Sequence, residues 1–109
     1  MRQTLTVVRE AHAPELVEPE TLAAVRRWLA RGWISREAAD RAVREIGELA
    51  LVRHRHAALR KRIWALRDRC SPYDACYVAL AEILDARLLT ADVRLSRAAT
   101  GLVPVTTPE

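Results

Sequence analysis

Three carboxylates, those of Glu20, Asp74 and Asp92, stand where the sequence predicts helices to begin. Pro19 marks the first helical position before Glu20, "SPY" leads into Asp74, and Asp92 closes the run "RLLTAD". Carboxylates held close together repel one another unless a cation lies among them, and hard oxygen ligands suit Mg²⁺ or Mn²⁺. An ion bound in this way can activate water and neutralise charge on a phosphodiester. The acids therefore predict a metal site made of Asp74, Asp92 and Glu20.

Each of these acids also has a purely structural interpretation. Ser71 to Asp74 matches a capping box, with Asp in the usual place of Glu. Asp92 fits the N-cap of "VRLSRAA", and the helix dipole favours Glu20 in a first turn. Helix starts meet at the ligand-binding edge of a parallel sheet only where a helix closely follows a strand. That condition holds for Glu20 and Asp92, whereas Asp74 follows a break between two helices, so its convergence with them is a hypothesis.

Apolar and amphipathic segments alternate along the chain. The patterns predict strands at 13–17, 49–55, 87–92 and 102–106, and helices at 19–31, 36–48, 57–69, 72–85 and 93–99. Such alternation is typical of an α/β fold with a parallel sheet covered by helices. The segment "TLTVV" at 4–8 has strand propensity, but no helix separates it from 13–17, as a parallel crossover would require.

The composition fits one soluble domain over residues 1–109. Half of the chain is apolar, which is enough for a packed core. No apolar run is long enough to cross a bilayer, and the N-terminus lacks the apolar region of a signal peptide. We therefore expect a cytoplasmic protein that does not bind membranes. Cys70 and Cys76 have neither zinc-site nor redox-pair spacing, so a structural role is expected for both.

The basic charge of the chain is uneven. The net charge is +4, and residues 53–69 are rich in arginine with a single acid, Asp68. Arg60, Lys61 and Arg62 lie on a predicted amphipathic helix in this segment. They are candidates for contacts with RNA phosphates, because guanidinium groups fork onto phosphate. The alternative is an ordinary solvated helix surface.

Two stretches of the sequence resemble a known family. The C-terminal stretch, "SPYDACYVALAEILDARLLTADVRLSRA", contains a YDA helix, an "A-LAE" continuation and a strand ending in "LLTxDxxL". This pattern resembles PIN-domain ribonucleases, in particular the VapC toxins of type II toxin–antitoxin systems. Upstream, "HAPELVEPETLAAVRRWLARGWIS" resembles the short second strand of that family and the helix after it. The resemblance covers about residues 12–105 and implies a PIN-like α/β/α sandwich with a parallel sheet.

The resemblance also implies a function and a set of site residues. Glu20 matches the acid of the first matching helix, Asp74 the aspartate of YDA, and Asp92 the aspartate after "LLT". Thr90 matches the polar residue beside it. The family uses such acids to hold Mg²⁺ and cut RNA, and its members usually dimerise and pair with an antitoxin. The implied function is a Mg²⁺- or Mn²⁺-dependent endoribonuclease toxin with RNA, a cognate antitoxin and a second copy of itself as partners.

The chain departs from the family pattern at its start. The family begins with a strand that bears an aspartate, followed by a helix, whereas no acid precedes Glu10 here. We therefore expect an N-terminally truncated PIN-like domain with weak metal affinity and little or no cleavage. Two alternatives remain open. One is a catalytically impaired PIN remnant that acts only by binding an antitoxin or partner subunit. The other is a basic helical nucleic-acid-binding module in which the acids are caps.

Overall fold

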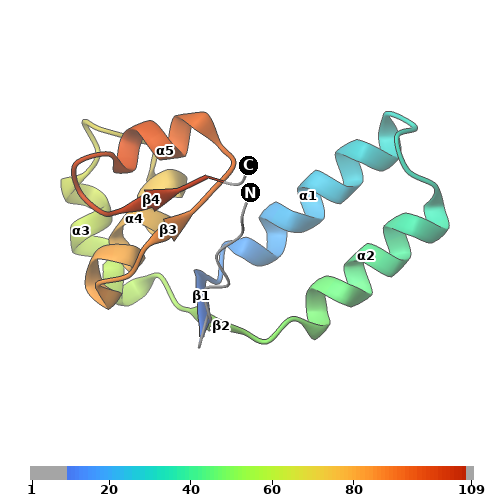
Figure 1. Cartoon of the computed structure of the whole chain (residues 1–109), viewed down its shortest axis with the longest axis horizontal. Coiled ribbons are helices and arrows are strands. Elements are labelled where there is room, and N and C mark those ends of the chain that lie inside the picture. Colours follow the sequence, from blue (N-terminus) through green and yellow to red (C-terminus); the bar gives the residue numbers. More distant parts are fainter. Residues whose placement is uncertain (1–9, 108–109) are drawn as a thin grey trace, which may run out of the picture. The chain divides into compact units, whose positions relative to one another are not determined.

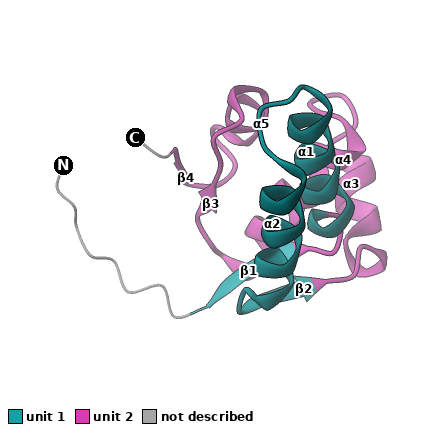
Figure 2. Ribbon diagram, turned by 90° about the vertical axis from the view of Figure 1, so that its right-hand side faces the viewer, with its two compact units in different colours: residues 1–13, 17–53 teal, residues 14–16, 54–109 magenta. Residues whose placement is uncertain are grey.

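The structure, a computed structural model, describes residues 10–107. Its internal contacts divide the chain into two compact units, shown in different colours in Figure 2. Unit 1 comprises residues up to Ala13 together with Val17–Arg53, and unit 2 comprises Pro14–Leu16 together with the chain from His54 onward. The expected single domain over 1–109 stays a prediction. Among the described residues, no helix has the length and apolar character that crossing a membrane requires.

Unit 1 is built around a pair of helices. They are α1 (Val17–Ala30) and α2 (Arg36–Glu48), which run side by side (Figure 1). Gly32 ends the first helix with a φ of 72°, a left-handed conformation that glycine adopts without strain. Ser35 begins the second by accepting a hydrogen bond from the amide of Ala38. Two short strands, β1 (Ala11–Pro14) and β2 (Leu51–His54), flank the helices in the chain and pair with each other.

Unit 2 carries Asp74 and Asp92. After a 3₁₀ turn at Ala57–Leu59, it contains three helices and two strands: α3 (Arg60–Ala65), α4 (Pro72–Leu84), β3 (Leu88–Leu89), α5 (Val93–Ala99) and β4 (Val105–Thr106). The strands β3 and β4 are parallel, and α5 lies between them in the chain (Figure 1). Parallel strands need such a crossover connection.

The core of unit 2 forms around α4. Ala75 and Val78 are completely buried, and they belong to a cluster with Leu66, Leu88 and Leu95. These residues come from the turn after α3, from β3 and from α5, so burial of one apolar helix fixes the elements on either side of it. Fully burying a side chain of the size of Val or Leu contributes about 1.5–3 kcal/mol. This packing anchors both helix starts that carry the aspartates.

The α/β class with parallel strand pairing is confirmed, while several element boundaries were wrong. The strands of residues 10–107 form two separate pairs. The strand expected at 13–17 ends at Pro14, and α1 starts at Val17, before Pro19. The helix expected at 57–69 is shorter: it starts as the 3₁₀ turn and ends at Ala65, after which the amides of Arg69 and Cys70 donate to the carbonyl of Leu66 in a turn. The strand expected at 87–92 has only Leu88 and Leu89 in the ladder. The "TLTVV" segment lies outside the described residues.

Candidate active site

Asp74 is held in the first turn of α4. The Ser71 hydroxyl accepts a hydrogen bond from the Asp74 amide at 3.1 Å, which confirms Ser71 as the N-cap. The Asp74 side chain does not complete the predicted capping box, since it makes no return bond to the amide of Ser71 in the described structure. Asp74 is only 7% exposed and is the one buried charged residue of the described chain. Its carboxylate is therefore buried without serving as a cap.

Asp92 has the capping role that the sequence predicted. Its Oδ1 accepts from the amides of Arg94 at 2.9 Å and Leu95 at 3.4 Å, which makes it the N-cap of α5. The Thr90 hydroxyl accepts from the Asp92 amide at 3.0 Å and so fixes the turn between β3 and α5. The cap uses one carboxylate oxygen of Asp92. The other oxygen, Oδ2, faces a different partner.

Arg94 joins the two aspartates. Its Nε lies 3.1 Å from Oδ2 of Asp74, and its Nη2 lies 3.9 Å from Oδ2 of Asp92. The exposed fraction of the side chain is 77% for Arg94, 48% for Asp92 and 10% for Asp74. A guanidinium that reaches in from solvent thus neutralises a buried carboxylate, and burying such a charge without a partner would be unfavourable. The structure therefore brings Asp74 and Asp92 to one cationic group.

The oxygen donors at this point suit a divalent cation. Asp74 and Asp92 offer carboxylate oxygens within reach of a single guanidinium, and Mg²⁺ and Mn²⁺ prefer such hard ligands. Within neither unit do three or more His, Cys, Asp or Glu side chains of residues 10–107 gather into a group that could hold a metal. Glu20 is exposed in the first turn of α1, in unit 1. Its convergence with the two aspartates stays a prediction.

The negative charge of Asp74 also acts on a neighbouring thiol. Burial raises the pKa of Cys70, the nearby Asp74 carboxylate raises it further, and Arg69 opposes this effect. A raised pKa keeps the thiol protonated and unreactive. Cys70 and Cys76 form no disulfide, and the structural role expected for both stays a prediction.

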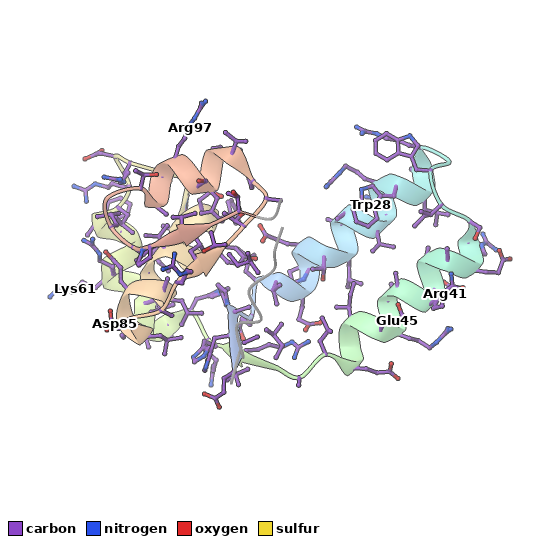
Figure 3. The ribbon with its side chains drawn as sticks, in the orientation of Figure 1. Trp28, Arg41, Glu45, Lys61, Asp85 and Arg97 are labelled. Carbon is purple, nitrogen blue, oxygen red and sulfur yellow. The ribbon has the colours of Figure 1, made fainter. Side chains whose placement is uncertain are left out.

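In the basic segment, one of the three residues predicted to contact RNA is paired with an acid of the fold. Arg62 forms a two-pronged ion pair with Glu82 on α4, with Nε–Oε1 and Nη2–Oε2 distances of 2.7 and 2.8 Å. This pair raises the pKa of Arg62 and lowers that of Glu82. Arg60 and Lys61 are exposed, and Lys61 extends away from the ribbon in Figure 3. The RNA-binding role predicted for the three residues stays a prediction, with Arg62 already engaged in the fold.

Comparison with known proteins identifies the family. The family model described as "PIN domain" matches residues 2–101. This chain belongs to the PIN-domain family. It is 38% identical to "VapC ribonuclease Mb0985" of Mycobacterium bovis and to "Ribonuclease VapC9" of Mycobacterium tuberculosis, over 94% of this chain and 80% of each relative. "Ribonuclease VapC1" of Mycobacterium tuberculosis is 42% identical over 81% of the chain and 67% of its own length. The VapC-type resemblance inferred from the YDA and "LLTxD" motifs is confirmed.

Sequence reasoning missed Arg94. The residue stands two positions after the predicted N-cap Asp92, where the first helical turn aims side chains back toward the cap. An arginine two positions after an N-cap aspartate is a usable signal for a contact with the cap carboxylate. Its second contact, with Asp74, depends on the packing of α5 against α4, which no local pattern reports.

Proposed function

We propose that this chain is a metal-dependent endoribonuclease of the VapC type that cleaves RNA phosphodiester bonds as the toxin of a toxin–antitoxin pair. One observation carries the proposal. In a chain of the PIN-domain family, the buried carboxylate of Asp74 and the second oxygen of Asp92 converge on one cationic group. The similar mycobacterial proteins are named as VapC ribonucleases, which supports a ribonuclease activity for this chain.

Asp74 and Asp92 would hold Mg²⁺ or Mn²⁺, with Glu20 as the third acid. A bound ion of this kind activates water and neutralises charge on a phosphodiester. The chain's own residues set the geometry for it. Ser71 fixes the turn that carries Asp74, and Thr90 fixes the turn that carries Asp92. Thr90 would act by positioning Asp92, because its hydroxyl is bonded to the Asp92 amide.

The expected partners follow from this proposal. RNA is the substrate, a cognate antitoxin is the inhibitor, and a second copy of the chain is the other subunit of a dimer. We also propose a cytoplasmic location, where RNA is present.

The Arg94 ion pairs favour a second candidate function. A guanidinium that permanently neutralises both aspartates would leave a PIN fold that binds an antitoxin or a partner subunit and does not cleave RNA. The two candidates differ in whether a divalent ion can replace Arg94 at the carboxylates.

A titration of Mn²⁺ into the chain, combined with an RNA cleavage assay, tests the proposal. Asp74→Asn should abolish both metal binding and cleavage, because a charged oxygen ligand is lost. Asp85→Asn is the matched control: it removes one carboxylate at the C-terminal end of the same helix, at a φ of 51° that asparagine tolerates. Equal metal binding by all three proteins would refute the metal site. Metal binding without cleavage would support the non-catalytic candidate.

A further inference from the structure

A pocket of about 640 Å³ lies beside Asp74 in unit 2. Its charged and polar lining consists of Arg69, Ser71, Asp74, Arg94 and Arg97. Three guanidinium groups thus share a pocket with one carboxylate, and the volume is typical of a ligand site. With three guanidinium groups and one carboxylate, the pocket carries an excess of positive charge that favours an anionic ligand. Arginine binds phosphate through two parallel N–H donors, so a phosphate group suits the pocket.

The three arginines have different partners. Arg69 is fixed, because it donates to the backbone carbonyls of Ala98 and Thr100 at the end of α5. The side chain of Arg97 is exposed, extends away from α5 in Figure 3, and makes no hydrogen bond or ion pair within residues 10–107. Arg94 is the one bound to carboxylates. In this pocket, therefore, Arg69 is bound to the backbone, Arg94 is bound to carboxylates, and Arg97 is available to a ligand.

Arg94 and a divalent ion require the same carboxylate oxygens. The Oδ2 atoms of Asp74 and Asp92 each face Arg94. A divalent cation bound between the two carboxylates would neutralise their charge in place of the guanidinium. Metal binding would therefore release Arg94. Because Arg94 and Arg97 stand three residues apart on α5, their side chains are neighbours on one helix face. The released guanidinium would stay within the pocket next to Arg97.

We propose that Arg94 and Arg97 form a binding site for a backbone phosphate of RNA, and that Arg94 becomes available to it only when a divalent ion occupies Asp74 and Asp92. This inference rests on the proposed metal site. It makes metal binding and phosphate binding mutually favourable, since a ligand that holds Arg94 away from the aspartates also removes a competitor of the metal. In an active enzyme, the Arg94 ion pairs would then hold the two carboxylates until a metal ion binds.

The first arm of the test is Mn²⁺ affinity, measured by calorimetry without nucleic acid. Arg94→Met should bind Mn²⁺ about two- to fivefold more tightly than the unmutated chain, as expected for removal of a partly exposed competing ion pair. Arg97→Met removes the same charge from the same pocket and should leave the affinity nearly unchanged. Arg94→Lys keeps the charge and should restore weaker binding. Arg94 is largely exposed, so these variants should fold, which circular dichroism can verify.

The second arm is binding of a 2′-O-methyl oligoribonucleotide, which resists cleavage, measured by fluorescence anisotropy with and without Mn²⁺. Mn²⁺ should strengthen binding to the unmutated chain, and this gain should be reduced in Arg94→Met. Arg97→Met should weaken binding under both conditions. Arg41→Met, which removes an exposed charge from α2, should change neither.

The outcomes separate this inference from the proposed function. Mn²⁺ binding that is lost in Asp74→Asn but equal in Arg94→Met and the unmutated chain would overturn the inference and leave the metal site standing. An equal gain on adding Mn²⁺ in Arg94→Met and the unmutated chain would also overturn it. If no protein in the series bound Mn²⁺, the proposed function would fail together with the inference.

Discussion

Nε of Arg94 lies 3.1 Å from Oδ2 of Asp74, so a largely exposed side chain on α5 neutralises a buried carboxylate on α4. The two residues belong to different helices whose packing is fixed by apolar side chains. The contact has two physical effects. It offsets the unfavourable burial of Asp74, and it occupies oxygens that a metal ion would need.

The first prediction concerns the stability of this pair without metal. Arg94→Met should destabilise the chain in EDTA, because Asp74 then keeps a buried charge with no partner. In an Asp74→Asn background, the same substitution should have almost no effect. The coupling free energy from this double-mutant cycle should be about 1 kcal/mol or less, given the exposure of Arg94. Urea denaturation of the four proteins measures it, and additive effects would show that the pair contributes nothing to stability.

The second prediction separates the two roles of Asp92. Asp92→Asn keeps an oxygen that can accept from the amides of Arg94 and Leu95, so the N-cap should survive. Asp92→Ala removes the cap and should lower the free energy of unfolding by about 0.5–2 kcal/mol. Both variants should lose Mn²⁺ affinity, as judged by calorimetry. If Asp92→Asn bound Mn²⁺ as well as the unmutated chain, Asp92 would be a cap alone.

The sequence was most informative where structure is local. The N-caps at Ser71 and Asp92 were predictable, because Ser and Asp before apolar helices have a short-range hydrogen-bonding reason to be there. The failed half of the capping box was not predictable. Whether the Asp74 carboxylate bonds to its own helix start or to Arg94 depends on how α5 packs on α4. Periodicity indicated correctly that Leu66 faces inward, but it did not show that α3 ends at Ala65. The chain turns there, and the amides of Arg69 and Cys70 donate to the carbonyl of Leu66.

The third prediction concerns acid stability and the Arg62–Glu82 pair. The pair lowers the pKa of Glu82 below its ordinary value of 4.5, so its stabilising effect is present above that pH and is lost as the pH falls through the lowered pKa. Arg62→Met should therefore destabilise the chain at pH 7 and have a vanishing effect in strong acid. Urea denaturation across this pH range measures the difference. Glu45→Gln on α2 serves as a control. It should leave the difference in the free energy of unfolding between pH 7 and strong acid unchanged.

The fourth prediction concerns the basic segment around α3. If Arg60 and Lys61 contact RNA phosphates, replacing both by methionine should weaken oligoribonucleotide binding. It should also flatten the dependence of log affinity on log salt by up to about one unit per lost contact. Arg62→Met should add little, because Glu82 already holds that guanidinium. Unchanged binding at every salt concentration would make this segment an ordinary solvated surface.

The last prediction concerns Glu20, the acid predicted from its place in the first turn of α1. If Glu20 is the third ligand, Glu20→Gln should weaken Mn²⁺ binding clearly but less than Asp74→Asn does, because Asp74 supplies the most buried of the carboxylates. Glu18, two residues earlier in the same helical turn, is the matched control for charge. Because it pairs with Arg53, the stability of its variant should be compared as well. Glu18→Gln should therefore lower stability and leave Mn²⁺ affinity unchanged. Calorimetry and urea denaturation on the two variants give both quantities. Equal Mn²⁺ affinity in Glu20→Gln and the unmutated chain would limit the metal site to Asp74 and Asp92.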